Sequence, residues 1–257
     1  MNVELERTMR SLRSRHINCV FAENREEAIG KITDLIPTGS VVGIGDSTTV
    51  AQIGIKAQLR KMGLKLIDGF DRGMIYASVK QYEEFHEKAI RESTLCDVFL
   101  TGTNVVTQDG RLVNVDATGN RVAGMVWGHA TTIIVVGRNK IVKDLDEAFH
   151  RLRKVVAPNH IRIRAVELGH WMGGRRMRTP CVLTGECGDC RNEDRMCNVF
   201  TIIENKPART NIHLIIINED LGLSWDASWE QERITNIIEN YKKHVWTARF
   251  RSDGRTE

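Results

Sequence analysis

Apolar residues in this chain fall either into short continuous runs or into stripes at helical spacing, and the two patterns predict different elements. The continuous runs are rich in β-branched residues, which is typical of strands buried in a parallel sheet. They predict strands over residues 18–21, 41–44, 64–67, 98–101, 131–136, 200–203 and 212–217. Two further runs, 105–106 and 112–113, flank Asp109-Gly110, a sequence that favours a hairpin turn.

The stripes predict helices between these strands. The last predicted helix starts near residue 228, and its stripe of Ile234, Ile237, Ile238 and Tyr241 has i, i+3, i+4, i+7 spacing. Other stripes predict helices over 3–14, from residue 24, and over 50–59, 81–91 and 144–153. Three helix starts carry the residues of a capping box, namely Asn24 with Glu27, Asp144 with Glu147, and Ser228 with Gln231.

Alternating strands and helices indicate an α/β fold with a mostly parallel sheet flanked by helices. Because no repeat and no linker rich in Pro, Gly or Ser divides the chain, we expect a single domain over residues 1–257. Residues 173–198 depart from the alternation, since they combine four cysteines with several arginines. We interpret this segment as a cysteine-rich insert that binds a metal or a cluster.

The composition is that of a folded protein: 41% of the 257 residues are apolar and 27% are charged, which excludes a disordered or collagen-like chain. No apolar run approaches the roughly 18 residues of a membrane span. The N-terminus lacks the apolar core of a signal peptide. We therefore expect a cytoplasmic protein, in which clustered cysteines favour metal or redox chemistry over disulfides.

The formal net charge of +4 is a mild basic excess. Much of it lies in residues 173–178 and in a group near the C-terminus formed by Lys242, Lys243, Arg249, Arg251 and Arg255. A nucleic-acid-binding protein would show a denser basic stripe or a recognisable reading motif. The sequence therefore disfavours nucleic acid as a partner and indicates an anion-binding patch near the cysteines. It leaves oligomerisation open.

The first candidate site follows the strand predicted at 41–44. Small and hydroxylated residues there leave a strand and enter a helix, the place where open α/β sheets bind ligands. The residues expected to bind a small anion are Gly45, Asp46, Ser47 and Thr48. A glycine turn with a helix cap would use the same residue types, and the segment matches no nucleotide-binding fingerprint.

A second polar segment follows the strand predicted at 98–101, with a density of Asn, Thr and Asp that exceeds the needs of a turn. Its expected substrate- or anion-binding residues are Thr101, Gly102, Thr103, Asn114, Thr118, Gly119 and Asn120. Asp116 is the carboxylate best suited to acid–base work, and Arg121 is the best anion anchor.

The four clustered cysteines are Cys181, Cys187, Cys190 and Cys197, in a C-x5-C-x2-C-x6-C pattern. Thiolates at such spacings can bind one iron–sulfur cluster or one zinc ion. Structural zinc sites usually have two Cys-x-x-Cys pairs, and only Cys187 and Cys190 form one here. Free or redox-active thiols are a third interpretation.

These segments together resemble the lactate-utilisation (LUD) domain family, in its single-domain, cysteine-bearing form. The resemblance extends from about Met9 to Gly222, and its matching stretches are 43–47, 100–104, 112–116, 118–123, 135–142 and 179–197. It implies a fold related to ribose-5-phosphate isomerase, glucosamine-phosphate deaminase and coenzyme A transferases. It also implies lactate oxidation beside iron–sulfur partner proteins, and therefore places a [4Fe–4S] cluster ahead of zinc as the expected cofactor.

Within the pocket that the resemblance implies, Asp116, Asn104 and Arg121 are the expected catalytic residues. Methylthioribose-phosphate isomerases have an aspartate at the position of Asn104 and a lysine at that of Val115. Since neither Asn nor Val can transfer a proton, the chain lacks the groups for isomerisation by that mechanism.

Three functions are compatible with the sequence. The first is an iron–sulfur enzyme or electron-transfer component that acts on a small hydroxy- or oxo-acid. The second is an isomerase or transferase of a small phosphorylated or acyl substrate, with a structural zinc site. The third is a non-catalytic anion sensor or a scaffold for iron–sulfur partners.

Overall fold

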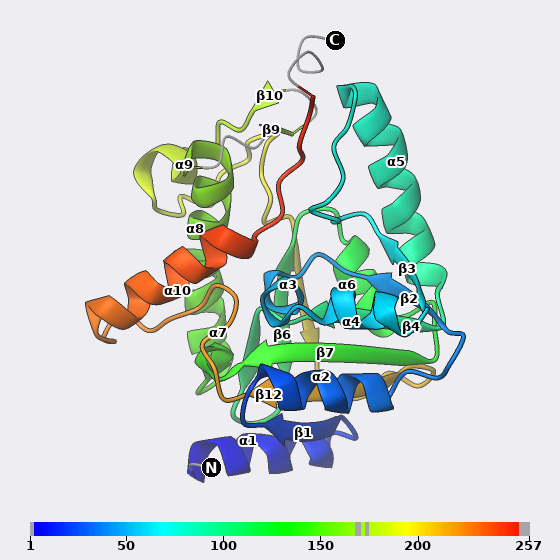
Figure 1. Ribbon diagram of the computed structural model, residues 1–257. Helices are drawn as coiled ribbons and strands as arrows, with labels where there is room; N and C mark the ends of the chain where they lie inside the picture. Colours follow the sequence, from blue (N-terminus) through cyan, green and yellow to red (C-terminus); the bar gives the residue numbers. More distant parts are fainter. Residues whose placement is uncertain (1–2, 168–170, 173–174, 252–257) are drawn as a thin grey trace.

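Six parallel strands form the central sheet of the protein, described by a computed structural model (Figure 1). Their order across the sheet is β1-β12-β7-β4-β2-β3, and every neighbouring pair is parallel. The bounds are β1 Asn18–Ala22, β2 Val41–Ile44, β3 Lys65–Asp68, β4 Val98–Gly102, β7 Thr131–Gly137 and β12 Asn211–Ile217. The α/β class and the parallel sheet expected from the sequence are confirmed.

The structure describes residues 3–167, 171–172 and 175–251. Gly173 and Gly174, which begin the predicted insert, lie outside the described residues, as does Arg255 of the predicted basic group. Within the described ranges, no helix is both long enough and apolar enough to cross a membrane.

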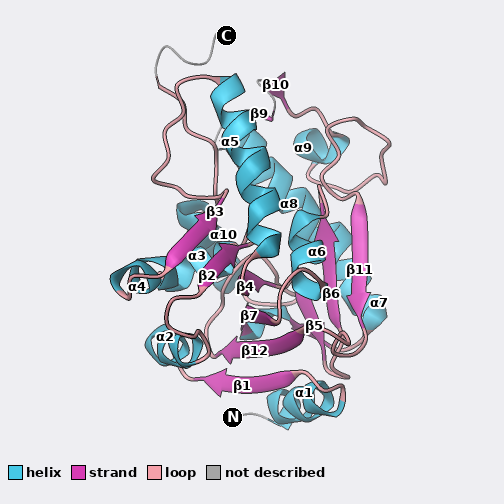
Figure 2. Cartoon of the chain, turned by 90° about the vertical axis from the view of Figure 1, so that its right-hand side faces the viewer, coloured by secondary structure: helices cyan, strands magenta, loops and turns pink. Residues whose placement is uncertain are grey.

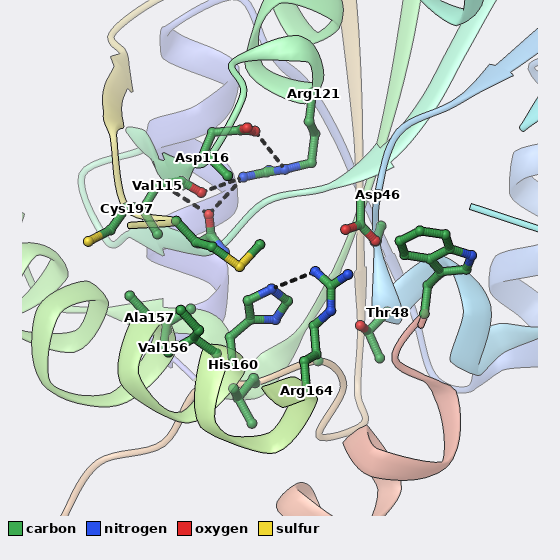
Figure 3. Close-up of a pocket in the computed structure, with 18 of the residues that line it drawn as sticks. Asp46, Thr48, Val115, Asp116, Arg121, Val156, Ala157, His160, Arg164 and Cys197 are labelled. Carbon is green, nitrogen blue, oxygen red and sulfur yellow. Dashed lines mark hydrogen bonds and ion pairs between the residues drawn. The ribbon is translucent and has the colours of Figure 1, made fainter. Parts of the chain in front are cut away.

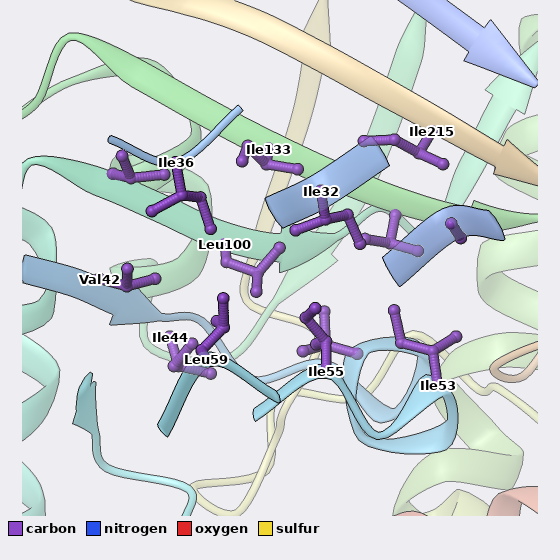
Figure 4. Close-up of a cluster of buried hydrophobic side chains, with 14 of the residues drawn as sticks. Ile32, Ile36, Val42, Ile44, Ile53, Ile55, Leu59, Leu100, Ile133 and Ile215 are labelled. Atoms are coloured by element: carbon purple, nitrogen blue, oxygen red, sulfur yellow. The ribbon is translucent and has the colours of Figure 1, made fainter. Parts of the chain in front are cut away.

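The side chains of β7 alternate between two hydrophobic clusters, one on each face of the sheet, because successive residues of a strand point in opposite directions. Ile133 and Val135 join the cluster under α2, α3 and α4 (Figure 4). Ile134 and Val136 join the cluster under α1 and α6. The helix bounds are α1 Val3–Ser14, α2 Arg25–Asp34, α3 Thr48–Ile53, α4 Ile55–Lys61 and α6 Asn120–Val126.

A second, four-stranded sheet covers part of the face that α1 and α6 share, and the sequence did not predict it. Its order is β11-β6-β5-β8, and its strands run across the direction of β1 and β12 (Figure 2). The bounds are β5 Val105–Thr107, β6 Leu112–Asp116, β8 Ile141–Val142 and β11 Val199–Ile203. The predicted hairpin is confirmed, since β5 and β6 pair antiparallel and Gly110 takes a positive φ of 90° at the turn.

The remaining helices surround the carboxyl ends of the main sheet. They are α5 Val79–Glu92, α7 Leu145–Arg151, α8 Ala157–Arg162, α9 Pro180–Thr184 and α10 Gln231–His244. Two π-helical segments, η3 Leu152–Val156 and η4 Ile163–Glu167, flank α8, so the chain stays helical well beyond the predicted end at residue 153. A short hairpin, β9 Trp171–Met172 with β10 Arg175–Arg176, precedes α9.

Two of the three predicted capping boxes are present. Asn24 accepts a hydrogen bond from Glu27 N at 2.9 Å, and Asp144 accepts one from Glu147 N at 3.0 Å. The prediction of a capping box at Ser228 is wrong. The helix α10 begins at Gln231 without a side-chain cap, and Ser228 instead donates hydrogen bonds to the Asp226 carboxylate.

The helix predicted over residues 50–59 is two helices, because Gly54 takes a positive φ of 74° and ends α3 before α4 begins. α3 begins four residues after β2 ends, and its Thr48 and Thr49 line the functional site.

Leu100→Ala tests the assignment of the hydrophobic core that lies directly beneath the site. Leu100 is fully buried in β4, two residues before the candidate site begins. We expect the free energy of unfolding in urea to fall by about 2–5 kcal/mol, the cost of emptying a buried leucine site. Leu95→Ala, at a 77% exposed leucine, is the matched control and should change it by less than about 0.5 kcal/mol. Equal losses in both variants would contradict this assignment of the core.

Candidate functional site

A cavity of about 210 Å³ lies beyond the carboxyl ends of the main-sheet strands. Segments that follow β2, β3, β4, β7 and β12 all reach it, as do β6, α5, α8, η4, α10 and the cysteine segment. Ligands of open α/β sheets bind at this edge. The position therefore identifies the cavity as the candidate site.

Most residues predicted for the site line this one cavity. Those from the strand-end loops are Asp46, Ser47, Thr48, Gly102, Thr103, Asn104, Asp116, Thr118, Asn120 and Arg121. Those from the cysteine segment are Cys181, Cys187, Cys190 and Cys197. The structure thus brings together two sets of residues that lie far apart in sequence.

Four predicted residues do not line the cavity but pack behind it: Gly45, Thr101, Asn114 and Gly119. A Cβ at Gly45 would lie 2.6 Å from the Thr101 hydroxyl oxygen, so only glycine lets these two strand ends approach. Gly119 takes a positive φ of 91° where α6 begins. These residues shape the loops rather than face a ligand.

Arg121 is buried and its guanidinium is fully engaged by the protein (Figure 3). Nη1 donates to Gly102 O at 3.1 Å and to Asn114 Oδ1 at 2.9 Å. Nη2 donates to Asn104 Oδ1 at 3.0 Å and to Val115 O at 2.9 Å. Because Nε forms an ion pair with Asp116, no N–H of Arg121 is left to bind an anion. Its role is to join the loops and to supply positive charge.

The two asparagines that contact Arg121 reinforce this arrangement. Asn114 Oδ1 also accepts hydrogen bonds from the Thr103 hydroxyl and from Asn104 N, both at 3.1 Å. Asn104 Oδ1 also accepts one from Val115 N at 3.0 Å. Asn104, predicted as catalytic, therefore uses its carbonyl oxygen to hold the guanidinium of Arg121 and the backbone of β6.

The two aspartates of the site differ in how they are bound. Asp116 Oδ2 lies 3.3 Å from Arg121 Nε, and its Oδ1 accepts a hydrogen bond from Gly119 N at 2.9 Å. Asp46 lines the cavity from the β2 loop, and within the described residues no hydrogen bond reaches its carboxylate. Burial raises the pKa of Asp46, while the charges of Arg164 and Arg121 oppose that rise. Asp46 is thus the better placed of the two for proton transfer.

A chain of polar contacts runs from η4 through α8 and α10 to α3. Arg164 Nη1 donates to His160 Nε2 at 3.3 Å, and His160 Nδ1 lies 2.5 Å from the Tyr241 hydroxyl. The Tyr241 hydroxyl also interacts with the Thr48 side chain. Burial, with the positive charges of Arg164 and Arg121, lowers the pKa of His160 to about 3. The imidazole is therefore neutral, and because Nε2 accepts from Arg164, Nδ1 carries the proton.

Aromatic side chains from three further segments line the cavity. His86 stacks on Trp246 with ring centroids 5.3 Å apart, and Phe70 contacts the same indole edge-on at 5.4 Å. The guanidinium of Arg164 lies over the Trp246 ring at 5.4 Å. Arg164 also contacts His160, and its guanidinium points toward Asp46 (Figure 3).

The cysteine segment is tied to the main site through β6 and Arg195. Asn198 N donates to Asp116 O at 3.0 Å, which fixes the end of the segment beside the pocket. Arg195 lines the cavity and donates to the carbonyl oxygens of Cys190 and Cys197. Two other arginines of this segment, Arg178 and Arg191, are exposed and do not line the cavity. Among the described side chains of the segment, Arg195 is therefore the arginine that lies next to the thiols.

The four thiols differ little in exposure, since all are half-buried. Burial raises the pKa of the Cys197 thiol, as do Cys187 and Cys181 nearby, while Arg195 lowers it. Among the residues that the structure describes, no three His, Cys, Asp or Glu side chains are grouped closely enough to hold one metal ion.

Sequence reasoning did not select the residues that enter the cavity from outside the two polar loops. They include Phe70, Tyr82, His86, Lys140, His160, Arg164, Arg195, Tyr241 and Trp246. Two signals could have found some of them. Lys140 follows an apolar strand just as the chosen loops do, and His160 and Arg164 are spaced i, i+4 on one helical face.

The chain belongs to the LUD domain family, whose family model matches residues 5–217. The resemblance inferred from the sequence is thereby confirmed, and membership supports a lactate-utilisation type of protein. A comparison with curated proteins found no match. Among solved structures, the crystal structure of a DUF162 family protein from Deinococcus radiodurans is similar over 83% of this chain and 96% of that chain, with 14% identity and a TM-score of 0.43.

The buried neutral His160 should make the protein sensitive to acid. Its pKa is about 3 in the folded state and about 6.5 in an unfolded chain. Between these values the unfolded state binds more protons, so stability falls as pH drops through this window. We expect His160→Asn, which keeps a donor toward Tyr241, to flatten the slope of unfolding free energy against pH. His150→Asn, at an exposed histidine, is the control, and equal slopes in both variants would contradict the assignment.

Proposed function

We propose that this protein binds a small 2-hydroxy- or 2-oxo-acid in the strand-end cavity, beside a [4Fe–4S] centre held by Cys181, Cys187, Cys190 and Cys197, and that the bound acid undergoes oxidation or reduction there. One observation carries the proposal: the four thiols and the polar strand-end loops line the same cavity. A redox centre has to lie close to its substrate, and the shared cavity meets that requirement.

The chemistry of the donor set suits an iron–sulfur centre, which would have to draw together thiols that are not grouped in the part of the chain that the structure describes. Four thiols share one cavity, and cysteine thiolates are the usual ligands of [4Fe–4S] clusters. Arg195 lies against two of these cysteines and would offset the negative charge of a thiolate-bound centre. When bound there, the cluster would supply a one-electron acceptor beside the substrate, with iron–sulfur partner proteins taking the electrons onward.

The size and charge of the cavity favour a small anion. Its volume of about 210 Å³ is below the roughly 300–1,000 Å³ of pockets for drug-sized ligands. Arg121, Arg164 and Arg195 line it, against the carboxylates of Asp46 and Asp116. Since cations outnumber carboxylates in this group, an anionic ligand would improve the charge balance.

Arg164 is the residue that we expect to bind the carboxylate of the substrate. Its guanidinium is oriented by the Trp246 ring at 5.4 Å and by His160 Nε2 at 3.3 Å. A guanidinium fork held in one orientation suits a planar carboxylate. Asp46 lies next to the guanidinium of Arg164 in Figure 3 and is therefore placed to take the hydroxyl proton when a 2-hydroxy-acid is oxidised.

Asp46→Asn tests the proton-transfer role, because asparagine keeps the shape of the side chain but cannot accept the proton. We expect kcat for anaerobic lactate oxidation, followed by reduction of a one-electron dye, to fall by ~100-fold or more. KM should stay within a few-fold, since Arg164 still binds the carboxylate. Asp34→Asn, at an exposed aspartate, is the control. Wild-type kcat in Asp46→Asn would refute the role.

Iron and acid-labile sulfide analysis of the anaerobically purified protein tests the cofactor. We expect both elements, with broad visible absorbance, in the wild type, and loss of both in Cys190→Ala. Cys96→Ala is the matched control, because Cys96 is buried in the core and burial raises its pKa to about 11. It should keep the cluster.

A colourless wild type with stoichiometric zinc would overturn the cluster and favour the isomerase or transferase with a structural metal. A protein that binds the cluster but turns over no hydroxy-acid would favour the sensor or scaffold.

A further inference from the structure

Lys140 is a buried lysine that the proposed function does not use. It ends the short helical turn η2 Arg138–Lys140 after β7, is 6% exposed, and lines the cavity. Lysine is almost never buried to this extent unless it is paired with an anion. Its position therefore calls for an explanation beyond packing.

The surroundings of the Lys140 amine suit its neutral form. Nζ donates to the Thr49 hydroxyl at 2.8 Å and to Thr103 O at 2.9 Å. No carboxylate among the described residues pairs with it, and the charged group that acts on it is the cation Arg121. Burial and Arg121 lower the pKa of Lys140 to about 7. A neutral amine has two N–H donors, which these two acceptors satisfy, and its lone pair remains available.

The backbone around the amine leaves it room. Gly222 takes a positive φ of 72°, which favours glycine, and a Cβ there would lie 2.5 Å from both Nζ and Cε of Lys140 and crowd the amine. The amine thus sits in a fixed position, held by α3 on one side and by the β4 loop on the other. A desolvated, held amine of this kind is the arrangement in which lysine acts as a nucleophile.

We propose that Lys140 is an amine nucleophile that forms an imine with the carbonyl carbon of a small 2-oxo-acid bound in the cavity. The inference rests on the proposed function for the carboxylate part of the ligand, since Arg164 and the other cations favour an anion there. The carbonyl part is new: an unprotonated amine selects an electrophilic carbon, and a 2-oxo-acid carries one next to its carboxylate.

The reaction balances without an oxidant or a reductant. The nitrogen lone pair forms a bond to the carbonyl carbon while the C=O π bond breaks, and the oxygen takes a proton. That oxygen then leaves as water, with the second hydrogen drawn from the nitrogen, and a C=N bond remains. Asp46 lines the same cavity, and we expect it to exchange these protons with the bound acid through water.

The test is reductive trapping on the full-length protein. Purified protein is incubated with pyruvate and sodium cyanoborohydride, which reduces an imine to a stable amine. We expect a mass gain equal to pyruvic acid less one oxygen atom, located by peptide mapping at residue 140. Lactate, which has no keto group, should give no adduct.

Two variants test whether Lys140 acts as a nucleophile or only as a positive charge. Lys140→Arg keeps a positive charge and N–H donors but cannot form the imine, and it should lose the adduct while melting as a folded protein. Lys88→Arg, at an exposed lysine of α5, should retain the adduct at residue 140.

Calorimetry with pyruvate distinguishes a failure of the imine proposal from a failure of the proposed function. Binding of pyruvate without an adduct at residue 140, or with adducts at other lysines alone, would overturn the imine and leave the proposed function standing. Absence of pyruvate binding would overturn both.

Discussion

The guanidinium of Arg121 holds the candidate site together. Its Nη atoms donate to a carbonyl at the end of β4, to a carbonyl in β6 and to two asparagine side chains, and Nε pairs with Asp116. Arginine suits this position because its five donors lie in one rigid plane and its charge persists when it is buried. Since these contacts join the main sheet to the second sheet, they hold in place the β4 and β6 loops that line the cavity.

Burying that charge has a consequence for the neighbouring residues. The positive field of Arg121 opposes the protonation of Lys140 and of His160, and desolvation acts in the same direction. On Asp46 the two effects oppose each other, because burial raises the pKa and the cation lowers it. One cation therefore helps to keep an amine and an imidazole neutral beside a carboxyl group, which is an arrangement suited to proton transfer.

The cysteine segment is part of this site rather than a separate module. Asn198 is bonded to the backbone of Asp116, and Asp116 is in turn paired with Arg121. The start of β11 therefore lies beside the pocket, and the thiols of the segment form part of its wall. A conformational change in the cysteine segment can therefore be transmitted to the strand-end loops through two contacts, from Asn198 to Asp116 and from Asp116 to Arg121.

The sequence by itself determined the main elements and much of the site. Continuous β-branched runs mark strands such as β2 and β7 because a strand covered on both faces has no position for a polar side chain. The same topology rule identified the loops after β2 and β4 as ligand-binding. It could not assign β6 and β11 to a second sheet, because strand pairing depends on long-range contacts that a local pattern does not contain. Nor could it reveal that Lys140, His160 and Arg164 face one cavity, or that every N–H group of Arg121 is bound by the protein itself. Those facts follow from how the layers pack, since burial and the loss of water decide which charged groups are paired, which become neutral and which face a ligand.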